Sequence, residues 1–194
     1  MSTATQVLRH EHEAILKMLD TAESIGESMA RNEKIRPEVL SQILEFFRLF
    51  ADQCHHGKEE SLLFPLLEQK GMPRQGGPIG VMLHEHEEGR ALMREMSEAV
   101  EAHNSGAEGA GARWARAARG YAQLLRSHIN KENNILFVMA ERVLTNDDQR
   151  QLVAQFEKLE VEKMGPGTHE RLHAMMDELL SEFPARPASR ASKE

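Results

Sequence analysis

Cysteine is almost absent from this chain: Cys54 is the only one in 194 residues, so no disulfide can form within it. This scarcity predicts a reducing, cytoplasmic setting. Long hydrophobic runs are also missing, and residues 1–9 do not have the charged and then apolar layout of a signal peptide. We therefore expect no membrane-spanning segment.

An excess of basic residues is missing as well. The chain carries 24 Lys and Arg against 31 Asp and Glu, which gives a formal net charge of −7. Without a basic surface, neither nucleic acid nor an anionic membrane is an expected partner.

Glycine and proline are sparse, and between them the apolar residues follow a helical spacing with no competing strand pattern. The fold class expected is all-α. Pro65 lies late in the second helix and predicts a kink or a change of register there. The helices expected span about 3–31, 37–69, 78–103, 112–144, 147–163 and 168–183.

The order of these segments predicts three parts. Residues 1–145 form an up-down-up-down four-helix bundle, and 146–183 form a C-terminal helical extension that packs on it. Residues 184–194 are small, polar and proline-containing, which predicts a disordered tail.

What the chain has in abundance is histidine, ten in all, arranged in an internal repeat. Each half contains a His-x-His segment followed by a His-x-x-x-Glu segment. Histidine and glutamate four apart lie on one face of a helix. The matched pairs are His12 with His86, His55 with His128, Lys58 with Lys131, Glu59 with Glu132 and Phe64 with Phe137.

Helical spacing indicates which of these side chains face the core. In 3–31, His12 lies on the apolar stripe and His10 does not. In 78–103, His86 lies on the stripe, whereas His84 and Glu88 share the polar face and form a decoy pair. In 112–144 the inward stripe is Trp114, Ala118, Tyr121, Leu125, His128, Glu132, Ile135 and Met139.

The helix over 37–69 leaves two choices, because His55/Glu59 and His56/Glu60 both have the spacing. His55 lies nearer the apolar direction set by Phe50 and Cys54. The repeat also selects His55 and Glu59, with His56 and Glu60 as the alternative pair.

Any single inward histidine could simply be hydrogen-bonded to a neighbour in the core. Burying four imidazoles and two carboxylates together without partners would be very costly, and a metal cluster is the simplest compensation. Two opposed carboxylates can each bridge two ions. Imidazole and carboxylate suit iron in preference to manganese or zinc. The predicted ligands are His12, His55, Glu59, His86, His128 and Glu132.

These ligands, with Lys-Glu-Glu-x-x-Leu-Phe-Pro at 58–65, resemble the hemerythrin-like (HHE cation-binding) family over about residues 5–145. The resemblance implies a four-helix bundle that holds two iron ions with a bridging oxo or hydroxo group. It implies that Glu59 and Glu132 bridge the ions and that the four histidines are terminal ligands.

Members of the family commonly use five histidines, and the matched pattern supplies four. One iron could therefore have an open or water-filled position. His169 is a candidate fifth ligand because it lies on the apolar side of 168–183, with a supporting or structural role as the alternative. Tyr121 could donate a hydrogen bond towards a bound ligand, or could be an ordinary core aromatic.

The expected function is binding or sensing of a small ligand such as O2, NO or peroxide. A second hypothesis is turnover of NO or peroxide, or iron–sulfur repair, with a redox partner. A third is a metal-independent helical interaction module. Neither the oligomeric state nor enzymatic activity follows from the sequence.

Overall fold

The computed structural model describes residues 2–31 and 33–184, and no strand occurs within these ranges. Four helical rods run through them, followed by two further helices. The rods are α1 (Ala4–Ala30); α2 (Pro37–Phe46) continued by η1 (Phe47–His56), η2 (Glu59–Leu63) and α3 (Phe64–Gln69); α4 (Pro78–Asn104); and α5 (Ala110–Lys131) continued by η3 (Glu132–Leu136) and α6 (Phe137–Val143). The further helices are α7 (Asn146–Met164) and α8 (Thr168–Glu182).

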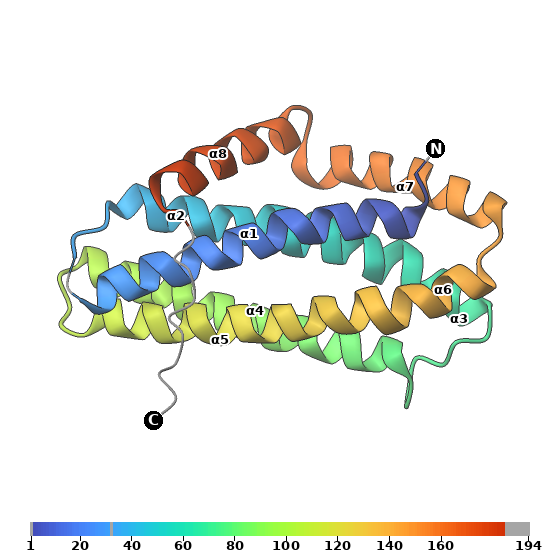
Figure 1. Cartoon of the computed structure of the whole chain (residues 1–194), viewed down its shortest axis with the longest axis horizontal. Coiled ribbons are helices and arrows are strands. Elements are labelled where there is room, and N and C mark those ends of the chain that lie inside the picture. The colour runs from blue at the N-terminus through green and yellow to red at the C-terminus, as the bar shows by residue number, and fades with distance from the viewer. Residues whose placement is uncertain (1, 32, 185–194) are drawn as a thin grey trace, which may run out of the picture.

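The four rods alternate in direction and form the predicted up-down-up-down bundle (Figure 1). Helix α7 packs on α1 and η1, and α8 packs on α1 and α2. The all-α prediction with two additional C-terminal helices is thus confirmed. Of the tail expected at 184–194, all but Pro184 lies outside the described residues. No helix in the described ranges is long and apolar enough to cross a bilayer.

Local sequence fixes where several helices begin. The Thr3 hydroxyl accepts a hydrogen bond from the backbone N–H of Gln6, whose side chain accepts one from the Thr3 backbone. Thr145 and Asp148 form the same reciprocal cap at α7. Such caps satisfy N–H groups that the first turn leaves without partners. Pro37 opens α2 at a position where its missing N–H costs nothing.

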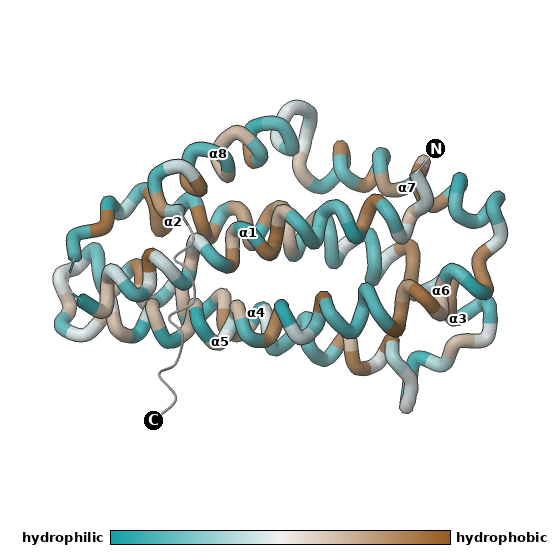
Figure 2. The backbone as a smooth tube through the Cα atoms, in the orientation of Figure 1, coloured by the Kyte–Doolittle hydropathy of each residue, from teal (hydrophilic) through white to brown (hydrophobic). Residues whose placement is uncertain are grey.

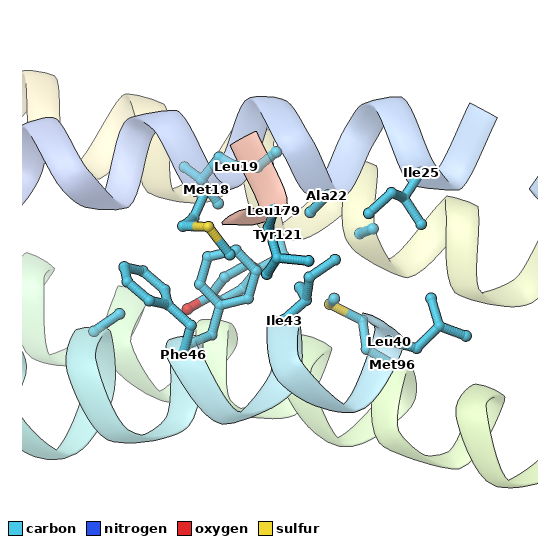
Figure 3. Packing of buried hydrophobic residues seen from close by; sticks show 14 of the residues in the cluster. Met18, Leu19, Ala22, Ile25, Leu40, Ile43, Phe46, Met96, Tyr121 and Leu179 are labelled. Carbon is cyan, nitrogen blue, oxygen red and sulfur yellow. The ribbon is translucent and has the colours of Figure 1, made fainter. Parts of the chain in front are cut away.

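Two clusters of buried apolar side chains fill the bundle. The first contains Trp114, Tyr121 and Phe46, and Figure 3 shows Tyr121 and Phe46 between α1 and the other rods. The second contains Phe64 and Phe137. Along α1, hydrophobic segments alternate with hydrophilic ones (Figure 2).

The buried histidines lie between these two clusters. On α1, His12 separates Leu8 of the second cluster from Ile15 of the first. On α4, His86 lies between Met82 of the second cluster and Met96 of the first. Apolar side chains therefore separate this polar layer from water at both of its ends.

Three stretches, η1, η2 and η3, are π-helical, with hydrogen bonds from residue i to i+5. The change of register predicted near Pro65 therefore begins upstream of it, in η1. In the last rod, η3 makes the predicted inward stripe wrong beyond Glu132. Ile135 is 52% exposed and Met139 is 37% exposed. Leu136, which follows Ile135, is buried instead. A π-helical hydrogen bond spans one residue more than an α-helical one, so the inward face moves on by one position.

Candidate metal centre

All six predicted ligands lie in the polar layer, and each is at most 1% exposed. They come from all four rods. His12 is on α1, His55 and Glu59 are on η1 and η2, His86 is on α4, and His128 and Glu132 are on α5 and η3.

The ligand atoms form two overlapping groups, and within each group they lie within 4.8 Å of one another. One group is His12, His55, Glu59 and Glu132, and the other is His56, Glu59, His86 and His128. Glu59 belongs to both. One oxygen of Glu132 also lies 3.1 Å from His12 Nε2 and 3.3 Å from His128 Nε2. The arrangement provides two adjacent cation positions with two carboxylates between them.

His56 is the fifth histidine of this centre. Its ring stacks on His86 with centroids 3.8 Å apart, and it is 3% exposed. The sequence offered His56 and Glu60 as an alternative to His55 and Glu59, yet the structure brings both neighbouring histidines inwards. They lie in η1, where the wider π turn separates neighbouring side chains by a smaller angle than an α turn does.

Glu60 does not join either group. It accepts hydrogen bonds from His86 Nδ1 and from Arg90, both at 2.7 Å. Arg90 also donates to Asp52, which lies 3.4 Å from His56 Nδ1. Arg90 thereby holds the two carboxylates that face His56 and His86.

His169, predicted as a candidate fifth ligand, is not brought to the centre. Its ring lies 5.6 Å from that of Phe50 and 4.5 Å from that of His173. Helix α8 packs on α2, and His169 belongs to neither group of convergent ligand atoms, whereas His56 belongs to one of them. The decoy pair faces water as expected, with side chains 75% exposed for His84 and 52% for Glu88. His10, expected off the apolar stripe, has a side chain that is 81% exposed.

Tyr121 lies in the first apolar cluster with its ring edge against Phe47, at 4.9 Å between centroids. Its hydroxyl is buried and has no hydrogen-bond partner. Figure 3 shows this oxygen on the side of the cluster where Met18 and Phe46 lie. Burial, and to a lesser extent the charge of Asp52, raise the pKa of Tyr121, so the hydroxyl keeps its proton and is available as a donor.

Two carboxylates that the sequence did not single out, Glu11 and Glu85, orient histidines of the centre. Glu11 accepts from His55 Nδ1 at 2.8 Å and from Lys58, and Glu85 accepts from His128 Nδ1 at 2.9 Å and from Lys131. The repeat could have indicated them, because Glu11 matches Glu85 just as Lys58 matches Lys131.

Each remaining ring is also held at Nδ1, by Asn133 for His12, Glu60 for His86 and Asp52 for His56. With Nδ1 engaged on all five rings, Nε2 is left facing the centre. Partners of this kind fix the tautomer and orientation of a metal-ligating histidine.

Two phenylalanines pack across the repeat. Phe137, from the second half, stacks on His12 of the first half at 5.6 Å. Phe64, from the first half, stacks on His86 of the second half at 6.0 Å. The two halves therefore support each other's histidines.

Several of the convergent atoms have no hydrogen bond: Nε2 of His12 and His55, and both carboxylate oxygens of Glu59 and of Glu132. Buried polar atoms without partners are costly, and adjacent carboxylates repel. Burial and then the charge of Glu132 raise the pKa of Glu59 well above its usual value. Burial acts in the same sense on Glu132, but His128 and His12 outweigh it and lower the pKa of that carboxyl. A pair of cations would satisfy all these atoms, and this donor set fits iron.

Fold and site together define a helical-bundle metalloprotein with two adjacent cation positions. The hemerythrin HHE cation binding domain matches residues 3–140, and the chain belongs to this family.

Two curated relatives are iron–sulfur cluster repair proteins by name. YtfE of Edwardsiella ictaluri (strain 93-146) is 36% identical over 107 residues, which are 54% of this chain and 48% of that protein. DnrN of Neisseria gonorrhoeae is 40% identical over 87 residues, 43% of this chain and 54% of that protein. The matched segments thus span about half the length of these relatives.

Proposed function

We propose that this chain is a non-heme di-iron protein that binds or senses a small oxidant or diatomic ligand such as O2, NO or peroxide. The observation that carries the proposal is the buried pair of cation positions, in which Glu59 and Glu132 each face histidines of both groups. A bridging oxo or hydroxo group would complete the pair, and iron is preferred to manganese or zinc for this ligand set.

The two positions are unequal, and this inequality favours ligand binding. One has three histidines, His56, His86 and His128, and the other has two, His12 and His55. In the repeat, His56 matches Ile129, a buried apolar residue that cannot act as a ligand. The position at His12 and His55 is therefore the less saturated one, where a small ligand would meet iron.

When bound, the iron pair would supply one-electron redox chemistry between Fe(II) and Fe(III). The protein residues perform the remaining tasks. Nδ1 hydrogen bonds hold the five rings in one orientation, and Glu59 and Glu132 hold the two positions together. The apolar clusters on either side limit water at the centre. The buried Tyr121 hydroxyl keeps its proton and could donate a hydrogen bond.

The test is anaerobic loading with Fe(II), followed by iron analysis and an optical spectrum after exposure to air. We expect two iron ions per chain and the charge-transfer absorption of a bridged ferric pair. Azide should then perturb the spectrum by occupying the less saturated position. Loading of fewer than two ions, or no charge-transfer band, would refute the proposal.

Iron–sulfur cluster repair is a second candidate, favoured by the names of the two relatives. In such a role the chain would give up iron or electrons to a damaged cluster, with a redox partner to restore it. Recovery of activity in an oxidatively damaged iron–sulfur enzyme, driven by stoichiometric iron-loaded protein, would favour repair. Catalytic loss of NO or peroxide without such recovery would favour turnover.

A metal-independent helical module is the remaining alternative. It requires that the carboxylates of Glu59 and Glu132 stay buried next to each other with only histidines as charge partners. Because a metal bound only to the folded state stabilises it, chelation should lower the melting temperature if the di-iron proposal is correct. An unchanged melting temperature would favour the module.

A further inference from the structure

Lys58 is a buried cation held between two carboxylates from different parts of the chain. Its side chain is 1% exposed, and Nζ lies 2.5 Å from Glu11 Oε1 and 2.9 Å from Glu160 Oε2. The second oxygen of Glu11 accepts from His55 Nδ1 at 2.8 Å. A continuous run of hydrogen bonds therefore joins Glu160, on α7, to His55.

Apolar residues of helix α7 also pack around Lys58. The ring of Phe156 lies 5.9 Å from Lys58 Nζ, which places the charge near its face. A side chain at Gly57 would meet Leu159 at 3.7 Å, so α7 packs directly against the turn that carries Lys58. Glu160 follows Leu159 and thus reaches Lys58 from a helix whose place is fixed.

The other half of the repeat has no counterpart of the Lys58–Glu160 ion pair. Lys131 pairs with Glu85, which orients His128, and the Lys131 side chain is 31% exposed. Within the described residues, Lys131 has no second carboxylate, and water can solvate its ammonium group. Water cannot solvate the ammonium group of a buried lysine in this way, so its charge requires protein partners.

We propose that Glu160 is a positioning residue for the metal centre: through Lys58 and Glu11 it holds the His55 ring in place. The family match ends at residue 140, so α7 lies beyond it. The C-terminal extension would then support the cation position of His12 and His55 more than that of His56, His86 and His128. The inference rests on the proposed di-iron function.

The test uses the full-length chain loaded with two Fe(II) ions, and follows the release of each ion to a colorimetric chelator. Altering a residue that orients a metal ligand typically weakens metal binding by about 10–100-fold. Glu160 reaches His55 only through Lys58 and Glu11. We therefore expect Glu160→Gln to release one ion up to about tenfold faster, at the low end of this range, and to leave the other nearly unchanged. Glu157→Gln is the matched control, because Glu157 is an exposed carboxylate on the same helix.

A second comparison asks whether Glu160 acts through Lys58. In a Lys58→Met background, Glu160→Gln should add no further acceleration. Glu160→Asp, which keeps the charge on a shorter side chain, should give an intermediate rate and serves as the test variant if Glu160→Gln fails to fold.

Equal acceleration of both ions would indicate general destabilisation and overturn the inference. So would an unchanged rate in Glu160→Gln, or a further acceleration by it in the Lys58→Met background. These outcomes are distinct from failure of the proposed function, in which the unaltered chain would not bind two ions at all.

Discussion

The ring of His56 lies almost parallel to that of His86, with centroids 3.8 Å apart and an angle of 16° between the planes. The two residues come from different rods, η1 and α4. Their contact closes the three-histidine position and makes the centre asymmetric, because the repeat has Ile129 where a second such histidine would stand.

The first prediction concerns this fifth histidine. His56→Ala should weaken iron binding at one position by at least about tenfold, since loss of a direct ligand should cost no less than loss of an orienting partner. His169→Ala should leave the iron content unchanged, because His169 contacts Phe50 and His173 instead. The number of iron ions bound per chain in competition with a chelator measures the effect of both substitutions. Equal losses would contradict the assignment of His56.

The second prediction separates the bridging carboxylate from the decoy. Glu132→Ala should abolish loading of two ions, because Glu132 lies within 3.3 Å of a histidine nitrogen in each group. Glu88 has an exposed side chain paired with His84, and Glu88→Ala should bind two ions as before. Metal analysis together with the optical spectrum reports the result, and a loss in both variants would show that the centre lies elsewhere.

The third prediction concerns Cys54, which is 1% exposed. Burial is the main cause that raises the pKa of its thiol, to about 12, with nearby Lys58 opposing the rise. Because the thiolate is the reactive form, the folded protein should not react with a thiol reagent at pH 8. Unfolding in urea should release one reactive thiol per chain. Rapid reaction of the folded chain would mean that Cys54 is accessible.

The fourth prediction concerns pH and the start of α7. A hydrogen bond from Lys70 is the main cause that lowers the pKa of Asp148 to about 2, followed by hydrogen bonds from Thr145. A carboxyl with a lowered pKa stabilises the fold above its unfolded value of about 4, and this contribution is lost as pH falls through 2. Urea midpoints of the unaltered chain and Asp148→Asn should therefore differ at pH 7 and converge near pH 2. If the two urea midpoints differ by the same amount at pH 2 as at pH 7, the charge of Asp148 is not the cause of the difference.

Much of the bundle follows from sequence because apolar spacing and capping residues are local signals. The start of α1 at Ala4 and the inward position of His12 need only helical periodicity and Thr3 as a cap. Periodicity and the repeat together also predict the six side chains that converge in the polar layer.

Departures from prediction come from features that periodicity does not encode. The π turns of η1 and η3 reverse the assignment of His56 and of Ile135, since the inward face shifts by one residue. Glu11 looks like a surface carboxylate beside His12 until tertiary packing places Lys58 and His55 against it. Glu160 has no sequence signal at all, because its partner lies on another helix.

The stacking of Phe137 on His12 and of Phe64 on His86 has a consequence for how such a chain can arise. Each hairpin contributes one phenylalanine ring that stacks on an imidazole of the other hairpin. A single hairpin would lack the ring that covers one of its histidines, and two identical hairpins could supply it to each other only as a symmetric dimer. Gene duplication followed by fusion would turn that pair into one polypeptide, free thereafter to let its two metal positions diverge.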